Sequence, residues 1–344
     1  MKQEETKPLK VSVVIPCYNL GEFLDEAVDS VLAQTYQDFE IIIVNDGSTD
    51  EATIKLLKDF NRPKTRVIHT ANQGLSMARN NGIKVSSGEY ICCLDADDKY
   101  HPEFLAKTVK VLDDDKKHAV GFVTTCVQHF GDETVTWKPF DFDPDRLAFM
   151  NVGHGSSLFR KECWDRVGGY LAEFRHGYED WNFWIAVTTV GYKWICIEEL
   201  LFYYRKRPNS MIKDADAKRV DNVRLIFKNN KAFYITNVES ILLKFMEVLE
   251  ECRKVNMEAL EERRKVNIET DRELGQMYSI VRDMNVEKDQ LRAEHDRQIV
   301  EKDRQMAEQD RQLAEKDIQM AEQRAEQDRQ LSEMDRQRAE KDIQ

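Results

Sequence analysis

The first part of the chain alternates short apolar runs with amphipathic stretches. Residues 11–15 read Val-Ser-Val-Val-Ile and end at Pro16, which is typical of a strand buried on both faces. Apolar residues then recur at steps of three and four over 23–32, which predicts an amphipathic helix. The run Glu40-Ile-Ile-Ile-Val44 predicts the next strand, and Asp50 supplies an oxygen that can cap a following helix. The pattern is therefore strand, helix, strand, helix.

The same alternation continues further along the chain. The next predicted elements are strands over 66–70, 89–94, 120–129 and 134–137, and helices over 75–85 and 102–112. Elements that alternate in this way form a doubly wound, mostly parallel α/β sheet with helices on both faces. We interpret residues 1–215 as one such α/β domain, in which the segment up to Arg207 completes the pocket, and residues 216–237 as a helical connector.

Beyond residue 238 the chain loses almost all Gly, Pro and aromatic residues and becomes repetitive. From Glu294 a unit of the form Glu-x-Asp-x-Gln-apolar-small recurs every seven residues, with a four-residue insertion at 322–325. Seven residues is the coiled-coil period, and a four-residue insertion is a stutter. One position per heptad is filled by Ile299, Met306, Leu313, Met320 and Leu331, whereas the earlier residues Leu274, Met277, Val281, Met284 and Leu291 fill two.

This repeat predicts a long α-helical coiled-coil tail over 238–344 that frays at its end. Residues 238–291 carry the stronger seam, so we expect them to form a homo-oligomer or to dock on a partner coiled coil. For the later repeats a solvated, charge-laced single helix is the alternative, because the position three residues after the apolar one is Lys or Gln.

Charge and composition exclude several classes of protein. A net charge of -12 argues against a nonspecific nucleic-acid binder, which needs a basic surface. No apolar run approaches the roughly 18 residues of a membrane span, and residues 1–10 are polar. We therefore expect no transmembrane segment and a cytoplasmic location, with peripheral contact to the inner face of the membrane left open. The seven cysteines include adjacent Cys92 and Cys93 but no CxxC pair, which favours buried free thiols over disulfides or metal ligands.

Three polar clusters follow predicted strands. They are Pro16-Cys-Tyr18-Asn19, Asn45-Asp46-Gly47-Ser48 and Asp95-Ala-Asp97-Asp98. Because ligands of open α/β sheets bind beyond the carboxyl ends of the strands, these clusters are the candidates for a site. Any one of them alone is also explained as a turn or a helix cap.

Taken together, the clusters suit a metal-bridged diphosphate. The carboxylates of Asp95, Asp97 and Asp98 would repel one another unless a cation neutralises them, and Mg²⁺ or Mn²⁺ takes carboxylate and phosphate oxygens. Arg79 lies on the predicted helix between the second and third clusters, where it could reach a phosphate or base, or could be a plain surface residue. Neither a P-loop nor a GxGxxG motif is present, which weakens ATPase and dinucleotide oxidoreductase readings.

Four ordered stretches carry a resemblance to a known family. They read Val14-Ile-Pro-Cys-Tyr-Asn19, Val44-Asn-Asp-Gly-Ser-Thr-Asp50, Asn72-Gln-Gly-Leu-Ser-Met-Ala-Arg-Asn80 and Leu94-Asp-Ala-Asp-Asp98. In this order and spacing the chain resembles the family 2 glycosyltransferases of the GT-A fold over about residues 10–212. Gly168-Gly169-Tyr170, Tyr178-Glu-Asp-Trp181 and Tyr203-Tyr-Arg205 extend the resemblance, and the tail lies outside it.

The resemblance implies roles for individual residues. The donor nucleotide sugar would be contacted by Pro16, Tyr18, Asp46, Arg79 and Asp95, with Asp46 accepting a hydrogen bond from uracil and Asp95 near the ribose. Asp97 would bind the Mn²⁺ or Mg²⁺ ion, and Asp180 would be the general base. The acceptor side or pocket wall would include His154, Glu179 and Trp181.

One position departs from the family pattern. Many relatives carry a histidine where this chain reads Arg207, before Ser210. A guanidinium cannot ligate a metal and binds phosphate instead, so we expect Arg207 to contact the nucleotide diphosphate. Either the metal is then held by Asp97, the diphosphate and waters, or another protein group such as His154 contributes a ligand. His154 is flanked by glycines and is either a pocket-lining residue or a plain loop residue.

The sequence favours a metal-dependent, inverting transferase that moves a hexosyl or N-acetylhexosaminyl group from a UDP-sugar to a glycan or lipid-linked acceptor, as in polysaccharide biosynthesis. A non-catalytic nucleotide-sugar-binding scaffold, organised by the coiled coil, is the alternative. A nucleotidyltransferase is a third reading, but it would need a basic, glycine-rich loop after the first strand. The acidic set Asp46, Asp95, Asp97 and Asp180 favours the enzyme, because a scaffold needs no carboxylates at both ends of a donor pocket.

Overall fold

The computed structural model describes residues 9–175, 177–207, 215 and 218–341. The chain forms two compact units, Met1–Glu251 and Cys252–Gln344. Pro208, Asn209 and Ser210, which follow Arg207 in the chain, lie outside the described residues.

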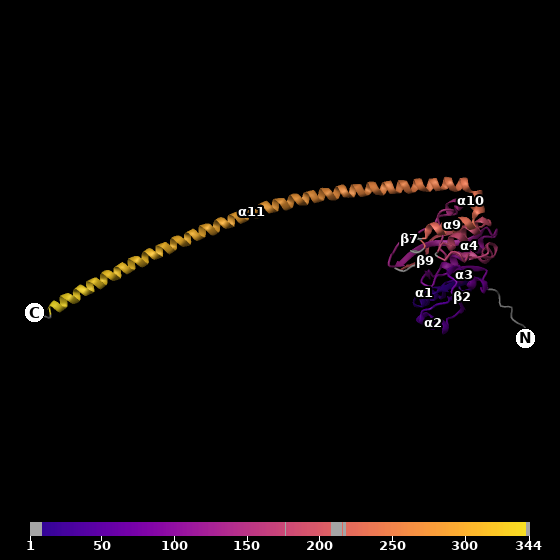
Figure 1. The fold of residues 1–344 in the computed structure, drawn as a ribbon, viewed down its shortest axis with the longest axis horizontal. Helices are drawn as coiled ribbons and strands as arrows, with labels where there is room; N and C mark the ends of the chain where they lie inside the picture. The colour runs from indigo at the N-terminus through magenta and orange to yellow at the C-terminus, as the bar shows by residue number, and fades with distance from the viewer. Residues whose placement is uncertain (1–8, 176, 208–214, 216–217, 342–344) are drawn as a thin grey trace. The chain divides into compact units, whose positions relative to one another are not determined.

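The first unit begins with the predicted parallel strands (Figure 1). The strands are β1 (Val11–Cys17), β2 (Phe39–Asp46), β3 (Thr65–Thr70) and β4 (Tyr90–Cys93), and the helices between them are α1 (Gly21–Leu32), α2 (Glu51–Lys58) and α3 (Leu75–Lys84). β1 pairs in parallel with both β2 and β4, and β2 pairs in parallel with β3. The Asp50 side chain caps α2 by accepting from the Thr53 backbone N–H at 2.8 Å, as predicted.

The second half of this unit extends the same sheet with mixed pairing. Its strands are β5 (Lys99–Tyr100), β6 (Val120–Gly131), β7 (Thr136–Trp137), β8 (Leu158–Arg160) and β9 (Lys193–Lys206), and its helices are α4 (Phe104–Asp114), α5 (Pro144–Leu147), α6 (Lys161–Val167) and α7 (Glu179–Thr189). β8 lies between β4 and β6 and is antiparallel to both, whereas β6 and β9 are parallel. The strand order is β3-β2-β1-β4-β8-β6-β9-β5, with β7 paired to β6.

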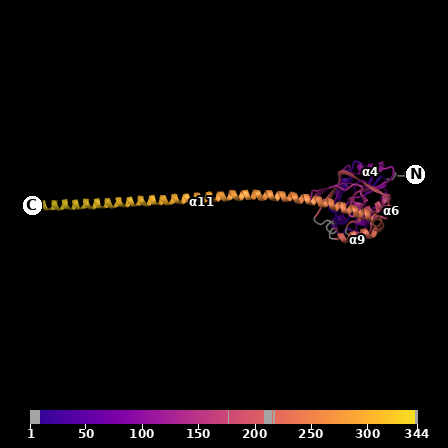
Figure 2. The ribbon, with the colours of Figure 1, turned by 90° about the horizontal axis from the view of Figure 1, so that it is seen from above.

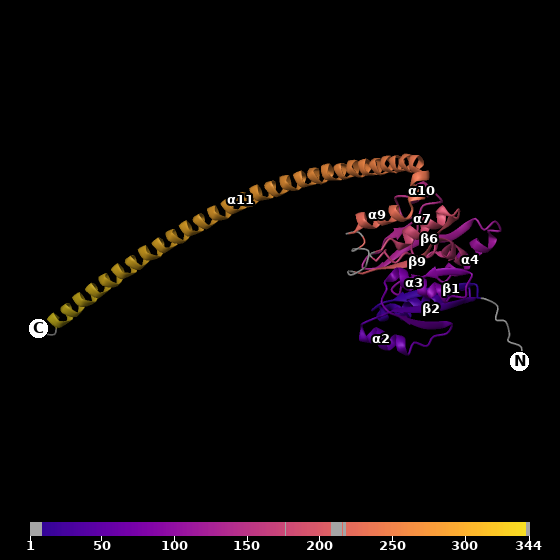
Figure 3. The same cartoon turned by 45° about the vertical axis from the view of Figure 1, so that its right-hand side comes forward.

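Alternation along the buried strands separates two cores, one on each face of the sheet. Figure 3 shows the strands β1 and β2 with the helix α3 beside them. Val13 and Ile15 of β1 pack with residues of α1 and α4. Val14, between them, packs with residues of α3, α6 and α7. The approach of α3 is close, because a Cβ added at Gly82 would lie 2.4 Å from Val14 Cγ1. The strand that carries the first polar cluster is therefore fixed from both sides.

The cysteines are free, as expected, but they are not all buried. The buried thiols are Cys17, Cys92, Cys93, Cys126 and Cys163. Cys196 is half-buried and Cys252 is exposed, so the expectation of burial is wrong for these two. Cys252 lies on a helix whose sides are largely open to solvent.

Helical structure continues to the end of the described chain. The elements are α9 (Arg219–Asn229), α10 (Lys231–Thr236) and α11 (Val238–Lys341), and α11 runs without a break in its helical backbone (Figure 2). The apolar residues Ile299, Met306, Leu313 and Met320 of the repeat are between 46% and 60% exposed. The seam side chains Leu274, Met277, Val281, Met284 and Leu291, and that of Leu331, lie outside the described residues. Within the described part of the chain, no helix is long and apolar enough to cross a membrane.

Candidate functional site

A cavity of about 330 Å³ opens beyond the carboxyl ends of β1, β2 and β4. It brings together six of the predicted site residues, namely Pro16, Tyr18, Asp46, Asp95, Asp97 and Arg207. These residues come from three separate strand ends and from the residue after β9, as expected for the ligand edge of an open α/β sheet. Asn72, Arg175 and Tyr204 also line it. Asn72 and Tyr204 stand in the quoted motifs, whereas Arg175 carries no signal in the sequence.

Asp46 fixes the turn that leads into α3. Its carboxylate accepts hydrogen bonds from the backbone N–H groups of Gln73 at 3.0 Å and Gly74 at 2.8 Å. The neighbouring Gly47 has a φ of 67°, and a Cβ there would lie 2.6 Å from the Asn72 backbone nitrogen. Asp46 thus holds the turn before α3 and forms part of the cavity wall. Its two oxygens retain lone pairs that can accept a hydrogen bond from a ligand.

Arg79 is not a surface residue, so that alternative is wrong. Its side chain is 2% exposed, and its two terminal nitrogens donate to Asp95 Oδ1 at 2.9 Å and to Glu179 Oε1 at 2.5 Å. A Cβ at Gly155 would come within 2.9 Å of the guanidinium, so the glycine allows the backbone to cover it. The guanidinium therefore bridges the third polar cluster and the first turn of α7 beneath the cavity.

Asp97 faces the cavity and is paired with Arg207. The Nε and Nη2 atoms of Arg207 lie 2.7 Å and 2.6 Å from Asp97 Oδ2. Burial and the charge of Asp95 raise the pKa of the Asp97 carboxyl, although Arg207 opposes the shift. The carboxylates of Asp95 and Asp97, which both line the cavity, are oxygen ligands of the kind that a hard divalent cation takes. No group of three His, Cys, Asp or Glu side chains that could hold a metal occurs among the residues the structure describes, so other ligands would have to come from phosphate and water.

Asp98, the third carboxylate of the cluster, does not line the cavity and is not a candidate ligand for the cation. It is 1% exposed, and its Oδ1 accepts from the Arg205 backbone N–H at 2.8 Å. Burial and the charges of Asp97 and Asp95 raise the pKa of Asp98 well above its usual range. Asp98 therefore joins the third cluster to β9, the strand that brings Arg207 to the cavity.

Asp180 lies in the first turn of α7, next to Glu179. Its Oδ2 accepts from Asn151 Nδ2 at 3.0 Å, and its Oδ1 accepts from the Trp181 backbone N–H at 2.7 Å. Burial and the charge of Glu179 raise the pKa of Asp180 to about 7. A carboxylate with that pKa can both take and release a proton at neutral pH. Asn151 was not singled out from the sequence.

The remaining predicted residues pack against the site without lining the cavity. The His154 ring stacks on Phe202 with centroids 4.2 Å apart, and burial lowers its pKa to about 3, so the imidazole is neutral. Trp181 is buried and its Nε1 donates to the Leu147 carbonyl at 2.7 Å. Glu179 is buried against Arg79. These contacts favour the packing interpretation for His154 and Trp181.

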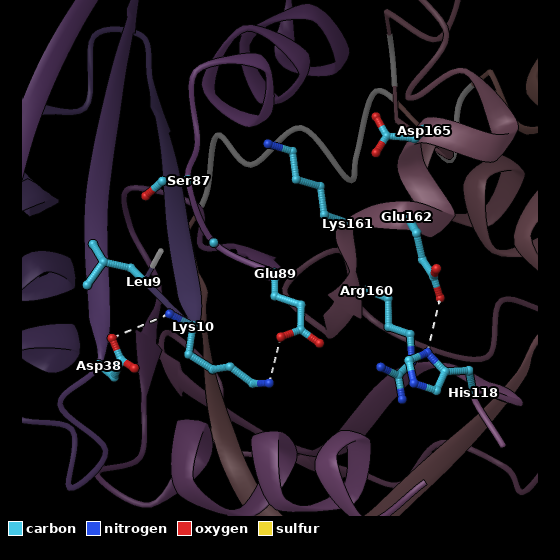
Figure 4. Close-up of a pocket in the computed structure, with 11 residues that line it drawn as sticks. Leu9, Lys10, Asp38, Ser87, Glu89, His118, Arg160, Lys161, Glu162 and Asp165 are labelled. Atoms are coloured by element: carbon cyan, nitrogen blue, oxygen red, sulfur yellow. Dashed lines mark hydrogen bonds and ion pairs between the residues drawn. The ribbon is translucent and has the colours of Figure 1, made fainter. Parts of the chain in front are cut away.

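A larger cavity, of about 560 Å³, lies at the amino ends of β1 and β4 (Figure 4). Its charged side chains neutralise one another or bind backbone. Lys10 pairs with Glu89 at 2.7 Å, and Lys161 Nζ donates to the Ser86 carbonyl at 2.7 Å. Arg160 is buried and donates to the carbonyls of Val120 and Leu112. This cavity lies at the wrong end of the sheet for an α/β ligand site and offers no convergent chemistry.

Comparison with known proteins agrees with the geometry. Residues 12–174 match the family model described as Glycosyl transferase family 2. The uncharacterized glycosyltransferase YibD of Escherichia coli strain K12 is 38% identical over 154 residues, which cover 44% of this chain and 43% of YibD. The uncharacterized glycosyltransferase EpsJ of Bacillus subtilis strain 168 is 30% identical over 219 residues, which cover 58% of this chain and 62% of EpsJ. The chain thus spans less than two thirds of either relative.

The fold has a solved counterpart. The crystal structure of S. aureus TarS 1-349 in complex with UDP-GlcNAc matches with a TM-score of 0.54 and 20% identity, covering 64% of this chain and 66% of that chain. The predicted GT-A-like α/β fold followed by a helical region is confirmed. The family match and the relatives support a family 2 glycosyltransferase domain, as the four sequence motifs predicted.

Proposed function

We propose that this chain is a metal-dependent, inverting glycosyltransferase that uses a UDP-sugar. The observation that carries the proposal is the cavity at the strand ends, which is lined by residues from all three polar clusters. A TarS structure of the same fold holds UDP-GlcNAc, which supports a UDP-linked donor and a hexosyl or N-acetylhexosaminyl group. The domain boundaries that go with this proposal are 1–215 for catalysis, 216–237 for the connector and 238–344 for the coiled coil.

The donor nucleotide would lie along the cavity from β2 to β9. Tyr18 is 44% exposed at the cavity rim, where its ring offers an apolar face to the base beside Pro16. Asp46 would accept from the uracil imide while it holds the turn before α3. Asp95, fixed by Arg79 from below, would accept from a ribose hydroxyl, so Arg79 would act on the nucleotide through Asp95. The diphosphate would then lie between Asp97 and Arg207.

The phosphate end of the cavity is lined by the guanidinium of Arg207 and by the carboxylates of Asp95 and Asp97. Asp97 would hold Mn²⁺ or Mg²⁺, and the ion when bound would act as a Lewis acid toward the departing diphosphate. Arg207 would turn part of its guanidinium from Asp97 to a phosphate oxygen, which a planar fork of donors suits. This use of Arg207 accounts for the absence of histidine at that position.

The chemical step would be a single displacement. An acceptor hydroxyl oxygen bonds to the anomeric carbon, the bond from that carbon to the diphosphate oxygen breaks, and the hydroxyl proton goes to Asp180. One carboxylate is enough, because inversion needs no covalent intermediate. The pKa of about 7 leaves a substantial fraction of Asp180 ionised at neutral pH. Glu179, one residue before it, keeps that pKa high while Arg79 restrains it.

The acceptor would be a glycan or a lipid-linked glycan, as in the synthesis of a surface polysaccharide. The exposed apolar residues Val238, Leu242, Phe245 and Leu249 of α11 recur at steps of four and three, which supports self-association or docking on a partner coiled coil. Residues 238–291 would carry that contact.

Calorimetric titration with UDP tests the donor site. We expect binding in the presence of Mn²⁺ that weakens strongly in EDTA and in Asp97→Ala. Asp221→Asn is the control for the loss of one carboxylate charge, because the Asp221 side chain is 74% exposed and does not line the cavity. Absence of UDP binding by the wild-type chain under every condition would contradict the proposal and would favour a different nucleotide or a non-catalytic scaffold.

A further inference from the structure

Asn151 contacts the proposed general base from a distant part of the chain. Its Nδ2 donates to Asp180 Oδ2 at 3.0 Å, across 29 positions of sequence. The other carboxylate oxygen accepts from the Trp181 backbone N–H at 2.7 Å. One donor therefore comes from the helix of Asp180 itself, and the other from the segment 151–157 between α5 and β8. Two fixed donors define the rotation of the carboxylate and the lone pairs that stay free.

The orientation of the Asn151 amide is set by a second contact. Its Oδ1 accepts from the Gly153 backbone N–H at 3.4 Å, which leaves the NH₂ group directed at Asp180. The same segment is anchored further along, because the Ser156 carbonyl accepts from the Tyr100 hydroxyl at 2.7 Å. The backbone that carries Asn151 is thus held by contacts to another part of the fold.

The segment also covers the bridging arginine. Gly155 lies so close to Arg79 that a Cβ would come within 2.9 Å of Nη2. The His154 ring between these contacts is stacked on Phe202 of β9. One stretch of seven residues, 151–157, therefore contacts Asp180 through Asn151 and the Arg79 guanidinium through Gly155.

We propose that Asn151 is a positioning residue for Asp180, which holds the carboxylate in its ionised form and directs its free lone pairs at the acceptor hydroxyl. The role in catalysis rests on the proposed function, whereas the hydrogen bond to the carboxylate does not.

The charges around Asp180 set the size of the effect. Glu179 of the same helix raises the pKa of Asp180 together with burial, and Arg79 of α3 lowers it. Tyr170, from the loop before α7, lies within electrostatic range of Asp180 and is itself neutral, because burial raises its pKa well above the usual range. The Asn151 hydrogen bond favours the charged form. Loss of one hydrogen bond to a charged group is expected to raise the midpoint by about one pH unit.

The direct test is the carboxyl ¹³C titration of Asp180 in the full chain labelled at aspartate. Asp180→Asn identifies the signal. We expect a midpoint near 7 in the wild-type chain and about one unit higher in Asn151→Ala. Asn151→Asp keeps the size of the side chain and replaces the donor with a second carboxyl group, so it should raise the midpoint further. Met150→Ala, at an exposed neighbouring position, should leave it unchanged.

A midpoint that stays at the wild-type value in both Asn151 variants would overturn the proposal. Turnover measurements separate this outcome from failure of the proposed function. With UDP-sugar turnover present, Asn151→Ala should move the acidic limb of kcat upward by the same interval and leave the KM for the donor within about twofold. If the midpoint moves but the chain turns over no UDP-sugar, the positioning of Asp180 by Asn151 is supported and the proposed function is overturned.

Discussion

Replacement of Arg79 by methionine should destabilise the first unit more than any single surface change. Its guanidinium is 2% exposed and neutralises Glu179, whose side chain is 6% exposed, and Asp95, whose side chain is 32% exposed. Removing one partner of a buried ion pair costs about 3–5 kcal/mol, because the other charge is left without compensation. In a unit of this size that loss corresponds to a fall of about 10 °C in Tm.

The assay is urea unfolding followed by tryptophan fluorescence. All five tryptophans lie at or before Trp194, so their emission reports the first unit and not the tail. Arg224→Met is the matched control, because Arg224 is 76% exposed and pairs with its exposed helical neighbour Asp221. We expect that variant to change the free energy of unfolding by no more than about 0.5 kcal/mol.

A double variant tests the cause of the loss. If the cost arises from the unpaired carboxylate of Glu179, then Arg79→Met with Glu179→Met should be more stable than Arg79→Met alone, by about 2 kcal/mol. Losses that simply add would refute the ion-pair reasoning and would point to packing of the long side chain instead.

Three further outcomes follow from the structure. Activity should fall about tenfold per pH unit below pH 7, because Asp180 is then protonated. The pKa of Asp180 is about 7 in the folded chain and about 3.9 in the unfolded chain, so its burial costs stability as the pH rises from about 4 to 7. Asp180→Asn should therefore have a higher Tm than the wild-type chain at pH 8.5, and the difference in Tm should shrink toward pH 4. Gly82→Ala should cost about 1–3 kcal/mol in urea unfolding because its Cβ meets Val14, whereas Gly275→Ala, with open space around it on α11, should raise the helical circular dichroism signal. Light scattering should give a multiple of the monomer mass for the full chain and the monomer mass for a truncation at residue 236, and equal monomeric masses would rule out self-association.

The strands of the first half were predictable because both of their faces are buried. The runs Val11–Cys17 and Phe39–Asp46 are buried at every position except Glu40, and their ends agree with the expected ranges within two residues. The polar residues that follow them were predictable as a site for the same reason, since parallel strands end at one edge of the sheet.

The contacts beneath the site were not predictable from such patterns. α3 buries Ser76, Arg79 and Asn80 beside the apolar residues Ala78 and Ile83, so its inner face is partly polar. Asn80 satisfies that burial by donating to the Tyr170 carbonyl at 2.7 Å and accepting from Trp164 Nε1 at 2.8 Å, residues far along the chain. Asn151 reaches Asp180 in the same non-local way. Periodicity reports only which neighbours a residue has along its own element, so these partners leave no local signal.

The position of the antiparallel strand β8 also depends on contacts that are distant in the sequence. It is three residues long, Leu158–Arg160, and too short to show a period of its own. Its place between β4 and β6 is set by pairing with residues of both strands that lie at least 35 positions away in the sequence.

The most direct test of the proposed function measures UDP release from UDP-sugars by the wild-type chain and by Asp180→Asn, with UDP affinity measured on both. We expect the wild-type chain to release UDP in the presence of an acceptor glycan and Mn²⁺, and the variant to lose that turnover while it binds UDP within about twofold of the wild-type affinity. Turnover that survives in Asp180→Asn would contradict the assignment of the base. A wild-type chain that binds UDP but turns over no UDP-sugar would contradict the assignment of the chain as an enzyme.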